Sequence, residues 1–187
     1  MIKKGGIIFL NGVTSSGKTT IAKIIQKTSG KNFYYVSNDV FYGLQGEIYN
    51  SNVYNNDGSM HAAEAVVLMY HFAKVLVEQG KNVLIDGMLH EYGEYIKIYG
   101  NTNYDIMRDV LADVSVFMVE VFCPLEECKR RNISRGDRGE NQSEEQSRIM
   151  NKNIRYNFFV DTSLYNADEC AEKILIEFDS KINKNDE

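Results

Sequence analysis

Hydrophobic and polar residues alternate along the chain in blocks whose spacing predicts strands and helices in turn. The run GGIIFLNG at residues 5–12 is apolar and bounded by glycine, which fits a buried parallel strand. A helix is predicted directly after it, from Gly17 to Lys27, because Ile21, Ile24 and Ile25 recur at helical spacing. The chain therefore opens with a strand followed closely by a helix.

The same patterns predict the rest of the chain. Apolar runs predict further strands at 32–39, 82–88, 115–123 and about 156–161. Helical spacing predicts further helices at 59–79, 104–112, about 143–154 and about 167–182. Pro124, with two glutamates close behind it, predicts the first position of one more helix. The segment 41–57 has no clean period and is expected to be irregular.

Strands that alternate with helices predict an α/β fold with a mainly parallel five-stranded sheet and helices on both faces. The length of 187 residues predicts a single domain, residues 1–187. Parallel sheets bind ligands beyond the carboxyl ends of their strands. Three predicted strands end in Asn11-Gly12, Asn38-Asp39 and Asp86, which we expect to converge on one edge of the sheet.

Charge and composition narrow the class of protein. The formal net charge is −5 and no dense basic tract occurs, which argues against nucleic-acid binding. The apolar runs are shorter than the ~20 residues of a membrane-spanning helix, so no membrane association is expected. Cys123, Cys128 and Cys170 lack zinc spacing and no secretory leader precedes them, which predicts reduced thiols in the cytoplasm. The three histidines also lack metal-ligand spacing and are expected to be structural or surface residues.

The segment GVTSSGKT, from Gly12 to Thr19, fits the phosphate-loop pattern G-x-x-x-x-G-K-[ST] between a predicted strand and a predicted helix. Glycines let the backbone bend close to a polyphosphate, while amides and the helix N-terminus point donors at it. Lys18 adds positive charge, and Thr19 can ligand Mg²⁺. An ordinary Gly/Ser turn before a helix is the alternative. We expect a nucleoside triphosphate to be bound by Gly12, Val13, Thr14, Ser15, Ser16, Gly17, Lys18, Thr19 and Thr20.

A bound nucleotide could be hydrolysed to switch shape or could donate its terminal phosphate. The guanine-reading string Asn-Lys-x-Asp is absent, since NKNI at 151–154 lacks the aspartate. A kinase needs a group that orients or deprotonates the acceptor hydroxyl. Asp39 could accept that proton, or could be a helix cap or turn former. Asp86 could hold Mg²⁺ through water or contact the acceptor, or could be a plain cap.

A kinase also needs mobile positive charge over the transferring phosphoryl group. The segment KRRNISRGDRGE places Arg131, Arg135 and Arg138 at i, i+4, i+7 spacing, which would put them on one face if the helix persists through Gly136. Such a face could close over the triphosphate as a lid at about residues 130–145; a solvated charged helix is the alternative. The predicted catalytic residues are Lys18, Asp39, Arg135 and Arg138, and the predicted metal ligands are Thr19 and Asp86.

Three segments carry a family resemblance. They are IIFLNGVTSSGKTTIAK at 7–23, VSNDVFYG at 36–43, and RGDRGENQSEEQ at 135–146 followed by YNFFVDTS at 156–163. NNDGS at 55–59 and VLIDG at 83–87 add less specific support. The chain resembles the chloramphenicol phosphotransferase family of small P-loop kinases over nearly its whole length. The residues at matching positions of the third segment are Arg135, Arg138, Gln146, Tyr156, Asp161 and Thr162.

This resemblance implies a P-loop kinase-like domain in which Asp39 is the proposed catalytic base. It implies ATP and Mg²⁺ as cofactors and a small-molecule hydroxyl as acceptor. The chain departs from the family at Asn151, where a histidine is expected, at Asn157, where an acidic residue is expected, and in the Tyr- and Asn-rich tract 41–54. We therefore predict ATP-dependent O-phosphorylation, with phenicol-type antibiotics among the candidate acceptors.

Two alternatives stay open. One is a P-loop kinase of another acceptor, such as a nucleoside, a nucleotide sugar or a protein. The other is a nucleotide-binding regulatory module that changes shape with ATP and transfers nothing. Products identified by mass separate the acceptors, and a partner whose affinity depends on nucleotide state would identify the module.

Overall fold

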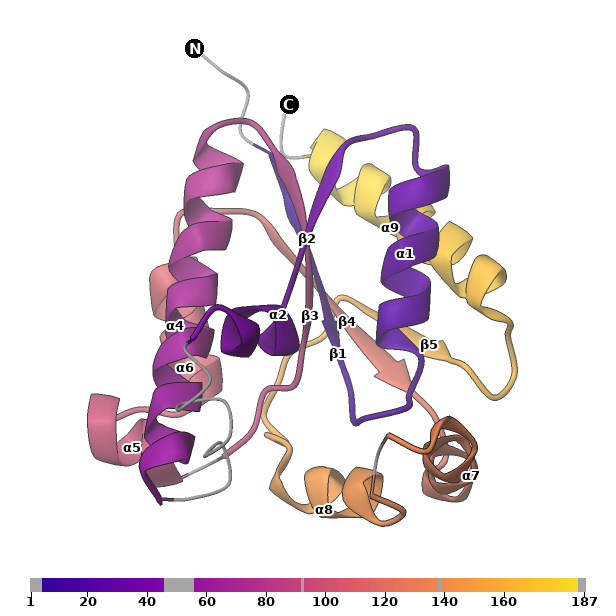
Figure 1. The fold of residues 1–187 in the computed structure, drawn as a ribbon. Helices are drawn as coiled ribbons and strands as arrows, with labels where there is room; N and C mark the ends of the chain where they lie inside the picture. Colours follow the sequence, from indigo (N-terminus) through magenta and orange to yellow (C-terminus); the bar gives the residue numbers. More distant parts are fainter. Residues whose placement is uncertain (1–4, 46–55, 92, 138, 185–187) are drawn as a thin grey trace.

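The protein is a five-stranded sheet with helices packed on it (Figure 1). The computed structural model describes residues 5–45, 56–91, 93–137 and 139–184. The strand order is β2-β3-β1-β4-β5, and every pairing between neighbours is parallel. The strands are β1 Ile7–Asn11, β2 Phe33–Ser37, β3 Asn82–Gly87, β4 Val116–Phe122 and β5 Phe158–Asp161. The predicted α/β class with a mainly parallel five-stranded sheet is confirmed.

The side chains of the central strand β1 divide between two apolar layers. Ile7 and Phe9 pack in one cluster, and Ile8 and Leu10 pack in the other, as the two-residue period of a strand requires. All four side chains are fully buried. A strand buried on both faces must be apolar throughout, which is why this run lacks the alternation of an exposed strand.

Helices cover both faces of the sheet, as predicted (Figure 1). The helices α1 Lys18–Thr28 and α9 Ala167–Lys184 lie together over one face. The long helix α4 Asn56–Glu78 and the helix α6 Asn103–Val110 cover the other face, with α5 Gly93–Tyr99 beside α4. None of the helices in the described ranges combines the length and apolar character needed to cross a bilayer.

Three short helices lie toward the carboxyl ends of the strands (Figure 1). They are α2 Asn38–Gly43, α7 Leu125–Arg135 and α8 Gln142–Ile149. Each follows a strand end or another short helix, so they frame the edge at which the sheet is expected to bind ligands. The predicted helix beginning at Pro124 is confirmed, although the proline is the residue before the first helical turn.

The helix α2 overturns part of the sequence interpretation. Residues 41–57 were expected to be irregular and Asp39 was expected to end a strand, but β2 ends at Ser37 and Asp39 lies in the first turn of α2. The Ser37 hydroxyl accepts a hydrogen bond from Val40 N at 3.2 Å and so caps the helix. Residues 46–55 of the expected irregular tract lie outside the described residues.

One further predicted helix end is wrong, and the condition on which a shared face of three arginines depended is not met. The helix predicted at 143–154 ends at Ile149, because Met150 turns extended and pairs with His90 in an isolated antiparallel bridge. The helix carrying the arginines ends at Arg135, because Gly136 adopts a left-handed conformation with φ of +71°. The helix α5 was not predicted at all.

Candidate active site

The loop between β1 and α1 has a backbone that only some residues permit. A Cβ atom on Gly12 would lie 2.4 Å from the carbonyl oxygen of Val121, so a side chain cannot fit there. Gly17 has φ of +106° and Ser15 has φ of +59°, both left-handed conformations. These turns bring the loop directly into the N-terminus of α1, whose first-turn amides have no acceptor within the helix. Such a loop can bind a phosphate group through its backbone.

The loop forms part of a cavity of about 570 Å³ at the carboxyl edge of the sheet. Two of the nine predicted nucleotide-binding residues point away from it: Val13 packs against the buried Cys123 and Cys128, and Ser16 is fully buried. The hydroxyl of Ser15, which lines the cavity, has no hydrogen-bond partner among the described residues. The cavity is also lined by the predicted residues Gly12, Thr14, Gly17, Lys18, Thr19 and Thr20.

The Lys18 side chain folds back over the phosphate loop. Its ammonium donates to the carbonyl oxygens of Gly12 and Val13, both at 2.8 Å, and lies 3.9 Å from Asp86. The positive charge is thereby held at the mouth of the loop rather than in solvent, since the Lys18 side chain is only 11% exposed. This placement suits a lysine that neutralises phosphate charge.

A small oxygen cluster lies beside Lys18. The hydroxyl of Thr19 donates to Asp86 at 2.5 Å, and the phenol of Tyr35 donates to the same carboxylate oxygen at 2.9 Å. Burial, together with the charge of Asp86, raises the pKa of Tyr35 to about 12. Tyr35 therefore stays a hydrogen-bond donor and fixes the direction in which the Asp86 carboxylate points.

The cluster has the chemistry of a Mg²⁺ site. Hydroxyl and carboxylate oxygens are the hard ligands that Mg²⁺ prefers, and Mg²⁺ in nucleotide sites takes few protein ligands because phosphates and water supply the rest. In the described ranges no group of three or more His, Cys, Asp or Glu side chains could hold a metal alone. Thr19 and Asp86, the predicted metal ligands, each bring one oxygen-bearing side chain of this kind to the cluster.

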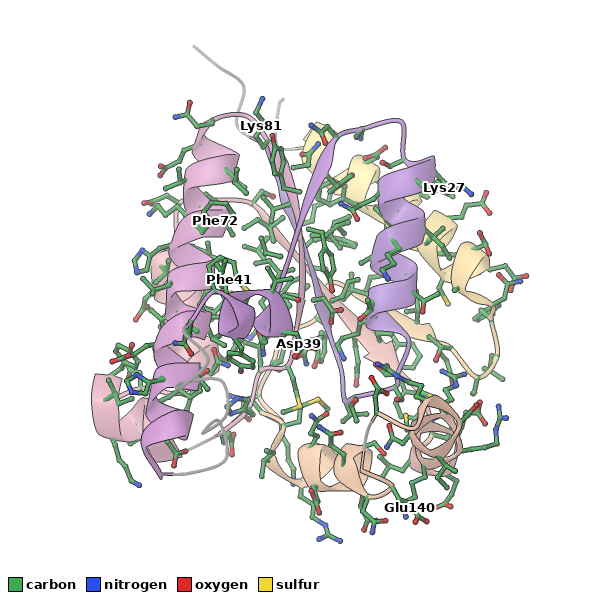
Figure 2. The ribbon with its side chains drawn as sticks, viewed as in Figure 1. Lys27, Asp39, Phe41, Phe72, Lys81 and Glu140 are labelled. Carbon is green, nitrogen blue, oxygen red and sulfur yellow. The ribbon has the colours of Figure 1, made fainter. Side chains whose placement is uncertain are left out.

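Asp39 lines the same cavity as the phosphate loop. It is exposed on the first turn of α2, and Figure 2 shows it at the end of that helix nearest the sheet. Ser37, Asn38 and Gly87 line the cavity on this side together with Asp86. The predicted convergence of strand ends on one edge therefore brings Asp39 and the phosphate loop to one cavity.

Arg131 is the arginine that the fold fixes against the phosphate loop. Its guanidinium donates to the hydroxyl and carbonyl oxygens of Thr162 at 3.0 and 2.9 Å, and to Ser15 O at 3.4 Å. The Thr162 hydroxyl in turn donates to Ser16 O at 2.8 Å. The Glu127 carboxylate accepts hydrogen bonds from Arg130 at 2.7 Å and from Arg131 at 2.9 Å. These hydrogen bonds lower the pKa of Glu127 to about 2.

Of the two arginines predicted to be catalytic, the structure describes Arg135. Arg135 lines the cavity but pairs with Asp137 at 3.1 Å at the exposed end of α7. Arg138 lies outside the described residues. Because α7 ends at Arg135, the helix does not persist through Gly136, which was the condition for a shared face of three arginines. Sequence spacing had included Arg131 in that face, but its contact with Thr162 depends on the packing of β5 and could not be anticipated.

The remaining positions of the resemblance surround the loop. Gln146 of α8 accepts a hydrogen bond from Thr14 N at 2.5 Å. Tyr156 accepts from the buried Asn11 side chain at 2.6 Å, and burial raises its pKa to about 12. Asp161 accepts from the backbone and hydroxyl of the serine that follows Thr162. Of this group, Gln146 and Thr162 line the cavity.

The fold is that of P-loop kinases of known structure. The family described as chloramphenicol phosphotransferase-like protein matches residues 5–179, and the chain belongs to that family. The resemblance noted in the sequence is thereby confirmed. A candidate O-phosphotransferase of Mycobacterium tuberculosis is 24% identical over 91% of this chain and 81% of its own length.

Solved structures show the same fold at low sequence identity. The APS kinase of Mycobacterium tuberculosis, in complex with AMPPNP and APS, aligns with a TM-score of 0.68 at 17% identity over 94% of this chain and 98% of its own. The shikimate kinase of Acinetobacter baumannii, in complex with shikimate, aligns with a TM-score of 0.64 at 17% identity over 96% of each chain. A gluconokinase of Sinorhizobium meliloti aligns with a TM-score of 0.63 at 14% identity, over 99% of this chain and 97% of its own.

Proposed function

We propose that the protein is an ATP- and Mg²⁺-dependent O-phosphotransferase that phosphorylates a hydroxyl group of a small molecule. The observation that carries this proposal is the single cavity shared by the phosphate loop and Asp39. A donor phosphate held at Lys18 and a hydroxyl held at Asp39 would meet inside it. Family membership and the kinases of the same fold support the class of reaction.

The nucleotide half of the cavity would bind the triphosphate. Loop amides and the N-terminus of α1 would donate to the phosphates, with Lys18 on the terminal groups. Thr19 and Asp86 would hold Mg²⁺, which when bound supplies charge neutralisation at the phosphates. Tyr35 would keep Asp86 in place through its hydrogen bond of 2.9 Å.

The acceptor half would place the hydroxyl at Asp39. The acceptor oxygen forms a bond to the γ-phosphorus, and the bond from that phosphorus to the bridging oxygen of ADP breaks. The hydroxyl proton passes to the Asp39 carboxylate. Arg135, at the end of α7, and Arg138 would neutralise charge that develops during transfer. The roles of both arginines remain predictions.

The acceptor class is a small molecule with a free hydroxyl, and phenicol-type antibiotics are its first candidates because of the family. The solved structures of the same fold include an APS kinase, a shikimate kinase and a gluconokinase. Hydroxyl compounds similar to APS, shikimate and gluconate therefore belong in the test panel. The reducing cytoplasm is the proposed compartment, and the free thiols of Cys123, Cys128 and Cys170 support it.

The first test is to incubate the protein with Mg-ATP and a panel of hydroxyl compounds that includes chloramphenicol, then to detect added phosphate by mass spectrometry. We expect one phosphate on at least one compound. Lys18→Ala should abolish the product while the variant stays folded, because transfer then lacks its main positive charge. An unchanged rate in Lys18→Ala would contradict the phosphate-loop assignment. A protein that binds ATP, phosphorylates nothing and binds a partner in a nucleotide-dependent way would instead be a regulatory module.

A further inference from the structure

Gln146 reaches the phosphate loop from a helix far along the chain. Its side-chain oxygen accepts a hydrogen bond from Thr14 N at 2.5 Å, across 132 residues of sequence. We propose that Gln146 is a catalytic residue whose amide nitrogen donates a hydrogen bond to the phosphoryl group during transfer. This inference rests on the proposed function and adds a neutral donor to the charged groups already described.

The contact with Thr14 fixes which way the Gln146 amide points. A backbone N–H is only a donor, so the atom that faces it must be the amide oxygen, and the NH₂ group must occupy the other branch. Among the residues that the structure describes, none accepts a hydrogen bond from that NH₂ group. Gln146 lines the cavity together with Thr14, Lys18 and Asp39, so its two donors are available where the phosphoryl group would pass.

The helix that carries Gln146 is held on two sides. On the α7 side, the buried Asn132 donates to the buried Ser143 at 3.3 Å, and Lys129 pairs with Glu144 at 2.9 Å. At its far end, α8 joins the segment after β3, where Glu91 N donates to Ile149 O at 2.8 Å. The position of Gln146 is therefore set by packing rather than by the ligand, which is the condition for an effective preorganised donor.

A neutral donor has a different effect from a cation at this place. Lys18 attracts the negatively charged nucleotide before and during transfer, so it contributes to binding as well as to rate. A fixed amide donor adds little attraction for the ground state, but it stabilises charge as that charge redistributes over the transferring oxygens. Removing the Gln146 side chain should therefore lower turnover much more than nucleotide affinity.

A competing interpretation gives Gln146 a different role. Its oxygen would take the place of a phosphate oxygen at Thr14 N and would leave when nucleotide binds. In that case, removing the side chain should tighten nucleotide binding and leave turnover unchanged. The two interpretations thus predict opposite changes in two measurable quantities.

The test compares Gln146→Ala and Gln146→Met with wild type and with Gln142→Ala. Met keeps the side-chain length without the amide, and Gln142 is a glutamine on the same helix that does not line the cavity. Calorimetry gives the affinity for MgADP alone and for MgADP with aluminium fluoride, a mimic of the transferring phosphoryl group. Turnover is measured on the acceptor found in the panel.

We expect both Gln146 variants to bind MgADP within about twofold of wild type. Their affinity for the aluminium fluoride complex and their turnover should fall by roughly 10² to 10³, the usual effect of removing one such donor. Gln142→Ala should match wild type in all three. If both Gln146 variants bind MgADP with aluminium fluoride as tightly as wild type does, the proposal is overturned. It is also overturned if they bind MgADP more tightly than wild type and their turnover is unchanged.

Failure of the proposed function would show differently. A wild-type protein that binds MgADP, forms no aluminium fluoride complex with any acceptor and transfers no phosphate would overturn the kinase assignment and the role of Gln146 with it. A wild type that forms the complex keeps the kinase assignment, so the Gln146 variants then decide the narrower question alone.

Discussion

At the scale of single residues, two carboxylates at the cavity differ in their surroundings. Asp86 is 8% exposed and accepts hydrogen bonds from Thr19 and Tyr35, so its direction is fixed. Asp39 is exposed on the first turn of α2, where an acceptor can reach it from solvent. A general base must contact the proton that it removes, whereas a metal ligand must stay still. Asp39 therefore suits proton transfer and Asp86 suits the metal.

Replacing Asp39 tests this division. Asp39→Asn should lower turnover by roughly 10² to 10⁴, because a positioned base is lost, while ATP affinity stays nearly unchanged. Turnover on the identified acceptor and calorimetric ATP affinity measure both effects. Asp109→Asn, an exposed carboxylate of α6 outside the cavity, is the matched control and should match wild type. A turnover rate that barely changes in Asp39→Asn would make Asp39 a structural residue.

The sequence predicts single residues well where neighbours along the chain decide their roles. Lys18 and Thr19 follow from a motif whose geometry is local. The roles of Tyr35 and Arg131 do not follow from a local motif. The contact of Tyr35 with Asp86 depends on the pairing of β2 with β3, and the contact of Arg131 with Thr162 depends on the packing of α7 against the end of β5. No spacing rule in the sequence contains either contact. Asp39 lines the cavity although the sequence predicts it at the end of a strand and the structure places it in α2.

At the scale of elements, an isolated antiparallel bridge joins the segment after β3 to the residue that follows α8. His90 pairs with Met150 in this bridge. The His90 ring packs edge-to-face against the Tyr95 ring, with 5.2 Å between the ring centroids. Helical spacing predicted α8 to continue to residue 154, but backbone hydrogen bonds to the bridge replace the helical ones. Such long-range pairing overrides local periodicity, which explains the misplaced helix end.

The buried His90 predicts loss of stability in mild acid. Burial lowers its pKa to about 4, whereas the unfolded chain has a histidine pKa of about 6.5, so below pH 6.5 the unfolded state binds more protons. Stability contributed by the neutral ring is present above pH 6.5 and is lost as the pH falls toward 4. Between pH 7 and pH 5 the loss is about 2 kcal/mol.

Urea unfolding at pH 7 and pH 5 measures this loss. In His90→Gln the difference in the free energy of unfolding between the two pH values should be smaller than in wild type by about 2 kcal/mol. His71, exposed on α4, is the control, and His71→Gln should keep the wild-type difference. Equal differences in wild type and His90→Gln would mean that His90 is not a buried neutral group.

At the scale of the whole molecule, the parallel sheet decides the position of the site, because its strand ends meet at one edge. The sheet lies between two apolar layers, and the cavity opens at its carboxyl edge between α1, α2, α7 and α8. The class of fold, the number of strands and their parallel arrangement could all be predicted, because buried parallel strands leave apolar runs that need no partner to be recognised. The short helices around the cavity carry weaker signals, and most errors fall there.

Nucleotide binding should stabilise the whole molecule, because it occurs in the folded state alone. At a hundredfold excess over Kd, Mg-ATP should add about 2.7 kcal/mol to the free energy of unfolding and raise Tm by roughly 5–10 °C. Thermal denaturation followed by circular dichroism measures the shift. Lys18→Ala should show a much smaller rise at the same concentration. An equal rise in both proteins would place the nucleotide away from the phosphate loop.

The central strand of the sheet is also the first strand in the chain. Its two neighbours, β3 and β4, come much later in the sequence, and β4 begins at Val116. At ribosomal rates of roughly 5–20 residues per second, Val116 follows Asn11 by roughly 5–20 s. For that interval at least one of the two pairing partners of the apolar run Ile7–Leu10 is missing from the nascent chain. Chaperone supply and translation speed should therefore govern the yield of folded protein in expression hosts.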